Sequence, residues 1–468
     1  MRFVDNKVED LKIAYIGGGS RDWGWTLMND LVTNDDMSGD VYLYDIDFGA
    51  AKDNEVIGAK YNCVPEAKSK WGFHAVKTIK EALEGANFVV ISILPGTFDE
   101  MESDVHTPEK YGIYQSVGDT SGPGGIVRAM RTIPMYEEIA EAIKKYCPDT
   151  WVINYTNPMT LCVKTLYRVF PEIKAFGCCH EVFSTQTLIC KMLEKEMGIK
   201  ATRDEIKINP VSVNHFTWLT SAKYRDMDLF PLYKAFAEKY KDGYTEELEE
   251  NWFNNFFASS QRVKFDLFNK YGYIVAAGDR HLAEFNDGTS YLKDPETVRS
   301  WGFGLTPISW RKEHRAEKIE ESRAIRAGEK EIEIRKTGEE GISQMKAILG
   351  LHDLVTNVNI PNVGQIPNLP IGAVVETNAV FRADSVTPVM AGNIPTEIYT
   401  LVSRICAEQE LVSAAIAKRD IQLIFNAFVS DPLVTCSYDD AKKLFKEMVL
   451  NTKEYLGDYD LTALDNLK

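Results

Sequence analysis

The sequence predicts an α/β protein in which a doubly wound parallel sheet of the Rossmann type is followed by an α+β domain. Three observations support this fold class. Short apolar strands alternate with amphipathic helices through about residue 205, as in βαβ units. The first strand leads directly into a glycine-rich turn at 17–20. After residue 213 long helical stretches with interleaved aromatic residues take over. We therefore expect a nucleotide-binding domain at 1–205 and a second domain at 206–468.

The first βαβ unit carries the features of a dinucleotide site. A strand at 11–16 ends in Gly17, Gly18, Gly19 and Ser20, and a helix is expected to run to about residue 32. Such glycines let the backbone approach a pyrophosphate at a helix N-terminus. The third glycine of the usual fingerprint is absent, because Asp22 stands there. A tight turn with Ser20 as a helix cap is the alternative interpretation.

The second strand, 40–44, ends at Asp45, which is the position of the acidic residue that binds a ribose hydroxyl. Asp45 and Asp47 together should repel a 2′-phosphate, so the sequence favours NAD over NADP.

The alternation continues along the chain. Strands are predicted at 88–93, 150–153, 173–176 and 208–213, and helices at 48–60, 78–85 and 132–146. Further helices are expected at 229–240, 246–270, 311–335, 395–428 and 438–455. The segment 311–335 is strongly charged, so we expect a solvated helix without a catalytic role.

Composition narrows the class of partner. The net charge of −16 argues against nucleic acid and anionic membranes. The eight cysteines are scattered rather than arranged as a disulfide framework, which favours a reducing cytoplasm. The chain has no apolar run of membrane-spanning length, and its charged N-terminus lacks the core of a signal peptide. A small-molecule ligand is the expected partner.

Polar residues gather after three predicted strands. Asn157, Cys179, His180 and His215 follow the strands at 150–153, 173–176 and 208–213. Ligands of open α/β sheets bind at the carboxyl ends of strands, and a thiolate with an imidazole can hold a divalent metal. The alternative is a buried thiol and a core imidazole with no ligand.

Two other segments carry candidate site residues. Gly278-Asp-Arg-His-Leu-Ala-Glu284 places four ionisable groups after an apolar run, which indicates either a base with anion-binding groups or an ion-pair network at a helix start. A glycine-bearing loop, 115–125, leads to Arg128 and Arg131. Such loops often close over a site, although flexibility alone also explains the composition.

Taken together, these elements resemble family 4 of the glycoside hydrolases over nearly the whole chain. The matching segments are Gly17-Gly-Gly-Ser20, Asn154-Tyr-Thr-Asn-Pro158, Cys179-His-Glu-Val182, Asn214-His215, Asn357-Val-Asn-Ile-Pro-Asn362 and Val375-Glu376. The Cys-His-Glu-Val tetrapeptide, Gln115-Ser-Val-Gly-Asp-Thr120 and Gly278-Asp-Arg-His-Leu-Ala-Glu-Phe285 are similar to the α-galacturonidase branch.

The resemblance implies a hydrolase that works through redox chemistry, with NAD and a divalent metal, usually Mn²⁺, as cofactors. NAD oxidises sugar C3, a base removes the C2 proton, the glycosidic oxygen is expelled, water adds at C1, and the hydride returns. Family 4 is a known exception to the usual two-carboxylate mechanism. The resemblance also implies a C-terminal α+β domain like that of lactate and malate dehydrogenases, and a homodimer or homotetramer.

Site roles follow from the same resemblance. Cys179 and His215 match the metal ligands, and His180 is the candidate acid. Asp279 is the candidate base, with Tyr271 or Tyr273 as alternatives. The cofactor-binding residues are Gly17, Gly18, Gly19, Ser20, Asp45, Pro95 and Asn154, and the substrate-binding residues are Asp119, Asn157, Arg131, Arg280 and His281.

A uronic acid substrate fits the cationic residues of these segments. Arg280 and His281, with Arg128 or Arg131, are expected to pair with a C6 carboxylate, because the planar guanidinium binds a carboxylate at two points. The substrate would be a uronic-acid glycoside or an oligogalacturonide. Alternatives are an α-glucuronidase or α-galactosidase of the same family, a dehydrogenase of the malate or lactate type, and a non-catalytic NAD-binding sensor.

Overall fold

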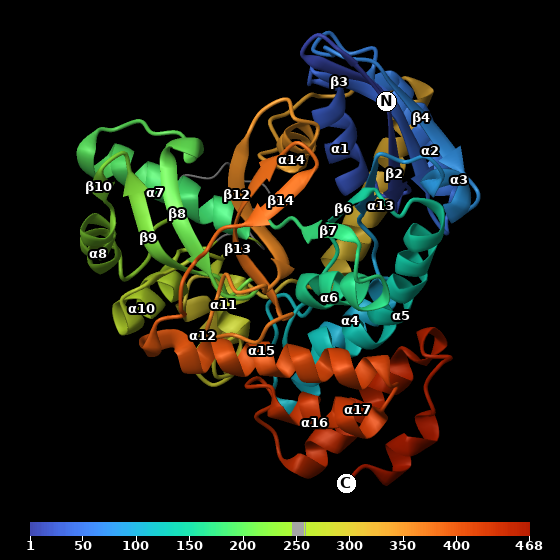
Figure 1. Ribbon diagram of the computed structural model, residues 1–468. Coiled ribbons are helices and arrows are strands. Elements are labelled where there is room, and N and C mark those ends of the chain that lie inside the picture. The colour runs from blue at the N-terminus through green and yellow to red at the C-terminus, as the bar shows by residue number, and fades with distance from the viewer. Residues whose placement is uncertain (246–256, 258) are drawn as a thin grey trace.

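The computed structural model describes residues 1–245, 257 and 259–468. Its larger sheet has ten strands in the order β14-β13-β12-β7-β6-β5-β2-β3-β4, with β1 beside β2 (Figure 1). The strands of this sheet are β1 (Arg2–Val4), β2 (Lys7–Ile16), β3 (Met37–Tyr44), β4 (Trp71–Val76), β5 (Phe88–Ile91), β6 (Trp151–Asn154), β7 (Lys174–Gly177), β12 (Leu354–Pro361), β13 (Val374–Arg382) and β14 (Ser385–Pro388). From β4 to β7 all neighbours are parallel, and their order is that of the Rossmann fold.

Helices cover both faces of the parallel region, because successive strand residues point to opposite sides. Ile13 and Tyr15 of β2 pack into one hydrophobic cluster, whereas Ala14 and Ile16 pack into another. The helices of this half are α1 (Trp23–Val32), α2 (Phe48–Tyr61), α3 (Ile79–Leu83), α4 (Phe98–His106), α5 (Gly122–Tyr146), α6 (Met159–Val169) and α7 (Glu181–Met197). The predicted doubly wound sheet is confirmed. Helix α5 begins ten residues before the predicted 132, inside the glycine-bearing segment.

Strands from late in the sequence complete the same sheet. β12 runs antiparallel to β7, with Asn359 opposite Gly177, and β13 and β14 continue outward in antiparallel pairs. The predicted boundary at residue 205 falls between α7 and the next strand, β8 (Ile206–Val211). The larger sheet therefore contains strands from both sides of this boundary: β1–β7 precede residue 205, and β12–β14 follow it.

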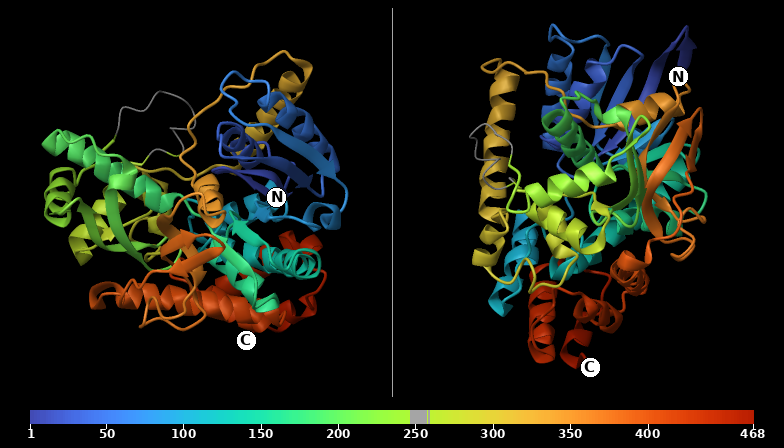
Figure 2. Two further views of the ribbon diagram at one scale, coloured as in Figure 1. Left: turned by 45° about the horizontal axis from the view of Figure 1, so that its top comes forward. Right: turned by 90° about the vertical axis from the view of Figure 1, so that its left-hand side faces the viewer.

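The smaller sheet lies on the other side of the molecule (Figures 1 and 2). It is four-stranded and antiparallel, with β9 paired to β8, β10 and β11. Its further elements are β9 (Trp218–Tyr224), β10 (Met227–Asp228), β11 (Ile274–Val275), α8 (Phe230–Lys239), α10 (Arg262–Tyr271) and α11 (Asp279–Glu284). Helix α10 covers only the end of the predicted 246–270 helix, because residues 259–261 before it are not helical and Gln261 has a left-handed φ of 62°. Residues 246–256 and 258 lie outside the described residues.

The remaining helices flank the two sheets, and α15 runs beneath both of them in Figure 1. They are α12 (Pro295–Ser300), α13 (Ile308–Ala327), α14 (Gly341–Ile348), α15 (Thr396–Ala417), α16 (Ile421–Ser430) and α17 (Tyr438–Asn451), with short 3₁₀ helices at Pro108–Tyr111, Arg203–Glu205, Lys453–Tyr455 and Leu461–Asn466. The single helix predicted over 395–428 is interrupted, because Arg419 has a left-handed φ of 56° and Asp420 caps a new helix. Within the described residues, no helix combines the length and apolarity needed to span a membrane.

Candidate active site

The glycine turn is packed so closely that only glycine fits. Gly17 has a φ of +99°, and a Cβ there would lie 2.0 Å from the carbonyl oxygen of Ser92. A Cβ on Gly18 would lie 2.7 Å from Leu43. Asp45, at the end of β3, accepts a hydrogen bond from the Gly19 N–H at 2.8 Å. The glycines, Ser20 and Asp45 therefore lie together at the carboxyl end of β2 and β3, where this fold class binds a nucleotide.

Asn154 is the last residue of β6, and Pro95 follows the end of β5 by four residues. The Asn154 side chain is fully engaged with the protein: its oxygen accepts from the Tyr136 hydroxyl and its nitrogen donates to the carbonyl of Thr156 at 3.0 Å. The carbonyl of Pro95 accepts from Arg131 Nε at 2.9 Å.

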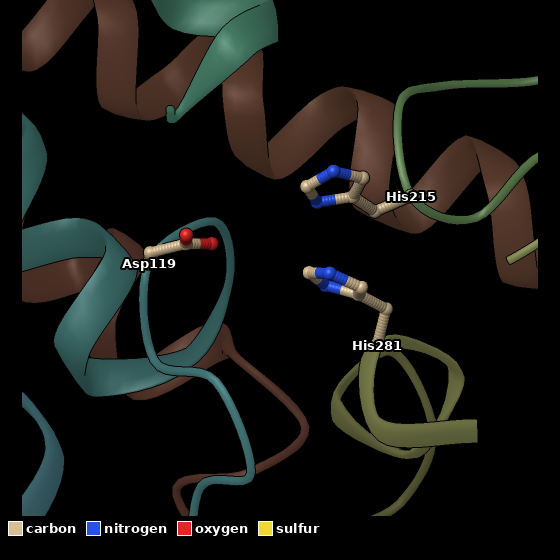
Figure 3. Close-up of side chains that lie close together, drawn as sticks. All are labelled: Asp119, His215 and His281. Atoms are coloured by element: carbon tan, nitrogen blue, oxygen red, sulfur yellow. The ribbon is translucent and has the colours of Figure 1, made fainter. Parts of the chain in front are cut away.

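Asp119, His215 and His281 form a cluster in which one ligand atom from each lies within 4.8 Å of the others. Figure 3 shows the three side chains pointing toward one another from three separate segments. The two imidazole rings are 3.9 Å apart between centroids, and Thr120 Oγ1 hydrogen-bonds both Asp119 and His215, at 2.7 and 3.1 Å. Sequence analysis placed His215 with a metal but assigned Asp119 and His281 to the substrate.

The cluster is positioned by helix α11 and the glycine-bearing loop. Glu284, one turn after His281, accepts hydrogen bonds from the backbone N–H groups of Val117 and Gly118 at 2.7 and 2.9 Å. The loop that carries Asp119 is thus fastened to the helix that carries His281. Burial raises the pKa of Glu284 to about 8. Sequence reasoning missed this function of Glu284, although the residue lies within the matched motif.

The donor set of the cluster fits a divalent metal. Burial lowers the pKa of His215 to about 3, aided by His281, and burial also lowers the pKa of His281, so both imidazoles are in the neutral form that ligates metals. The buried His281 Nδ1 has no hydrogen-bond partner among the described residues. Two imidazoles and a carboxylate suit a borderline transition metal better than an all-oxygen ion such as Mg²⁺.

Cys179 is not among the three residues of this cluster. Its thiol is buried and close to Asn214, the residue before His215. Burial, and then the carboxylates of Glu376 and Glu181, raise the pKa of the Cys179 thiol. A thiol ligates a metal as the thiolate, and the raised pKa of Cys179 disfavours that form. The pairing of Cys179 with His215 at a metal stays a prediction.

His180 directly follows Cys179, and its side chain is half exposed. It stacks on Trp23 at 6.0 Å between ring centroids, and its Nδ1 lies 3.6 Å from Glu339. Glu181 Oε1 lies 3.9 Å from His180 Nε2 and 3.7 Å from His281 Nε2. A buried carboxylate thus links the candidate acid to the cluster.

Asp279, the predicted base, is fully buried at the start of α11. Its Oδ1 accepts the backbone N–H of Lys264 at 3.0 Å, so it also caps the first turn of α10. Burial raises the pKa of Asp279, against the nearby Lys264 cation. A raised pKa brings a carboxylate nearer to the range useful for proton transfer at neutral pH.

Among the cationic residues that the sequence predicts for the substrate, the structure finds two fully engaged with the protein. Arg131 forms a buried, two-point ion pair with Asp104. Arg280 donates to the carbonyl of Ser116 at 2.5 Å and to Thr306. Near them, the Asn157 carbonyl accepts from Arg128 Nε at 3.1 Å, and Asn157 Oδ1 is buried without a partner in the part of the chain that the structure describes.

A sheet with the Rossmann strand order, a tight glycine turn after β2 and a histidine–carboxylate cluster are the features of a nucleotide-binding fold with a candidate metal site. The Family 4 glycosyl hydrolase model matches residues 12–195, and the model of the Family 4 glycosyl hydrolase C-terminal domain matches residues 211–434. The chain belongs to family 4 of the glycosyl hydrolases, and the resemblance noted in the sequence is confirmed.

Relatives named alpha-galacturonidase match almost all of the chain. It is 60% identical to an alpha-galacturonidase of Thermoanaerobacterium saccharolyticum over 99% of this chain and 100% of the relative. It is 50% identical to an alpha-galacturonidase of Bacillus subtilis over 96% and 98% of the two chains. The crystal structure of lplD from Bacillus subtilis superimposes with a TM-score of 0.89 at 50% identity, covering 94% of this chain and 100% of that one.

Proposed function

We propose that this protein is an α-galacturonidase that removes terminal α-linked galacturonic acid with the help of NAD and a divalent metal. One observation carries the proposal. Four relatives named alpha-galacturonidase are 50–60% identical over 96–99% of the chain. A relative named alpha-galactosidase, from Bacillus subtilis, is 28% identical. We therefore propose a uronide, rather than a neutral galactoside, as the substrate.

NAD fits the turn between β2 and α1. Gly17, Gly18, Gly19 and Ser20 would hold its pyrophosphate, Asp45 a ribose hydroxyl, and Pro95 and Asn154 the nicotinamide end. NAD would supply the hydride acceptor and donor at sugar C3. Members of the same fold, about 20% identical, include a Thermotoga maritima 6-phospho-beta glucosidase described with manganese, NAD⁺ and glucose-6-phosphate.

A divalent metal, with Mn²⁺ as the candidate, fits His215 together with Asp119 and His281, with Cys179 close by. A metal there would act as a Lewis acid on the sugar oxygens. His180 is proposed to protonate the leaving oxygen, because its half-exposed ring directly follows Cys179 in the chain and lies 3.9 Å from Glu181. Asp279 is proposed to take the C2 proton, and Asn157 to contact the sugar.

The test is a substrate panel: p-nitrophenyl α-galacturonide, α-glucuronide and α-galactoside, each with and without NAD, Mn²⁺ and a reductant. We expect cleavage of the galacturonide only, and only when NAD and the metal are present. Cleavage of the galactoside in place of the galacturonide would overturn the substrate, and net accumulation of NADH would indicate a dehydrogenase instead.

A further inference from the structure

Helix α13 places one arginine, Arg311, against the proposed active site. Ile308, Ser322 and Ile325 of this helix are buried, and most of its other residues are charged. Trp310 stacks on His314 at 5.1 Å between ring centroids, and the two rings form a stripe on one face. Arg311 lies next to this stripe. Its guanidinium is 5.9 Å from the ring of Phe257, and the guanidinium of Arg280 is 4.6 Å from the same ring. Arg311 of α13 and Arg280 at the start of α11 therefore both lie near the ring of Phe257.

Arg311 and Arg128 retain hydrogen-bonding capacity that Arg131 and Arg280 have lost. The Nε of Arg311 and the Nη1 of Arg128 are buried, and neither atom has a hydrogen-bond partner within the described ranges. Arg128 is 5% exposed and directs only its Nε to the Asn157 carbonyl. Asn157, the proposed sugar contact, is thus in direct contact with an arginine that has donors to spare.

The Asp119 carboxylate acts electrostatically on both arginines. Burial lowers the pKa of Arg311, while the Asp119 carboxylate raises it and Arg128 lowers it further; Arg128 likewise acts on Asp119. No ion pair joins either arginine to Asp119 among the residues described. Arg128 is buried and Arg311 partly buried, and Asp104 and Asp22 also act on Arg128 and Arg311, respectively. A bound carboxylate would engage the buried donors of the two arginines that have no partner in the described part of the chain.

We infer that Arg128 and Arg311 together bind the C6 carboxylate of the uronic acid, and that Arg311 determines the preference for uronides over neutral sugars. This inference rests on the proposed function. Two guanidinium forks suit a carboxylate because each offers parallel N–H donors. Arg131 and Arg280 instead hold the protein structure around the site.

The test compares Arg311→Met, Arg311→Gln and Arg311→Lys in the enzyme supplied with NAD and Mn²⁺. Arg315→Met, on an exposed position one turn along α13, is the matched control. The substrates are p-nitrophenyl α-galacturonide and its methyl ester, which keeps the ring but lacks the charge. Arg311→Met should lower kcat/KM for the uronide by about 10- to 150-fold, the value of a charged hydrogen bond, and should change the ester by less than about threefold.

Binding of free galacturonate, followed by calorimetry, gives a readout that does not depend on turnover. Arg311→Lys should recover part of the lost affinity, because it restores the charge without the fork. Equal losses of kcat/KM on the uronide and the ester, or unchanged galacturonate binding in folded Arg311→Gln, would overturn the proposed binding of the carboxylate by Arg311. Neither result would affect the proposed function. If the wild-type enzyme binds galacturonate through Arg311 but does not cleave the uronide, the proposed function is overturned. The proposed binding of the carboxylate by Arg311 is then still supported.

Discussion

The imidazole ring of His281 lies 3.9 Å from that of His215, centroid to centroid, although 65 residues separate them in the chain. If these rings and Asp119 hold the metal, His281→Ala should weaken Mn²⁺ binding by about 100-fold, at or beyond the upper range seen for the loss of a metal-supporting contact. Calorimetric titration with Mn²⁺ measures this directly.

His352→Ala, in the connection before β12, serves as the control and should bind Mn²⁺ as the wild type does. Cys179→Ala is the informative comparison. Loss of Mn²⁺ binding in Cys179→Ala, with unchanged binding in His281→Ala, would move the site from the Asp119–His215–His281 cluster to Cys179 and His215.

Asp279→Asn should separate proton transfer from the capping of α10. Asparagine can still accept the Lys264 N–H, but it cannot act as a base at neutral pH. We expect kcat to fall by about 10²- to 10⁴-fold, together with the exchange of solvent deuterium into C2 of the product. Tyr273→Phe is the control. Normal exchange in Asp279→Asn combined with loss in Tyr273→Phe would assign the base to Tyr273.

Asp45→Ala should weaken NAD binding by about 10-fold or more, because a charged hydrogen bond contributes roughly 1.5–3 kcal/mol. It should also reduce the discrimination against NADP, since one carboxylate facing the 2′ position is lost. Fluorescence titration with both nucleotides measures the two affinities. Asp40→Ala, at a half-exposed residue of β3 that pairs with His74, should leave them unchanged. An NAD/NADP ratio that stays constant in Asp45→Ala would exclude a ribose contact.

Glu408 and Asp431 form a buried pair of carboxyl groups beneath the start of α5, where Asp431 also accepts the Gly122 N–H at 2.8 Å. Burial, and the proximity of the two acids, raise the pKa of Glu408, against the charge of Arg404. The folded protein therefore keeps a proton that the unfolded chain releases above its pKa of about 4.3, and the free energy of unfolding falls as the pH rises from there toward the folded pKa.

Glu408→Gln supplies a neutral partner at every pH, so its stability relative to wild type should grow by up to about 1.4 kcal/mol per pH unit between pH 5 and the folded pKa. Guanidinium melts at pH 5, 6, 7 and 8 would follow this difference. Glu397→Gln, on the exposed first turn of α15, is the control. A constant difference across this range would show that Glu408 is ionised in the folded state.

Most of the doubly wound half of the fold could be predicted from sequence because its signals are local: β2, β3, β5, β6 and β7 are short apolar runs that alternate with helices. The strand β4 (Trp71–Val76) was not predicted, because its burial is mixed and it lacks a continuous apolar run. The pairing of β12 with β7 could not be predicted, since no local pattern indicates which edge a late strand will join. The site shows the same limit. Asp119, His215 and His281 were each singled out, but their mutual proximity depends on how three distant segments pack.

Arg311 illustrates a second limit. A run of charges predicts a solvated helix, and most of α13 is solvated. The signal for its buried side is the pair of aromatic rings at Trp310 and His314, one turn apart, which indicates a contact stripe. That spacing identifies a face of the helix but not the neighbour it meets, so the place of Arg311 beside Arg128 required the tertiary structure.

The pairing of Asn359 with Gly177 has a consequence for the newly made chain. When β7 leaves the ribosome its outer edge has no partner, and the strand that covers it is still 182 residues away. At a synthesis rate of about 5–20 residues per second, this edge stays open for roughly 10–40 seconds. An open strand edge is a site for pairing with other chains, so the yield of soluble protein should depend on translation speed and on chaperones that bind nascent chains.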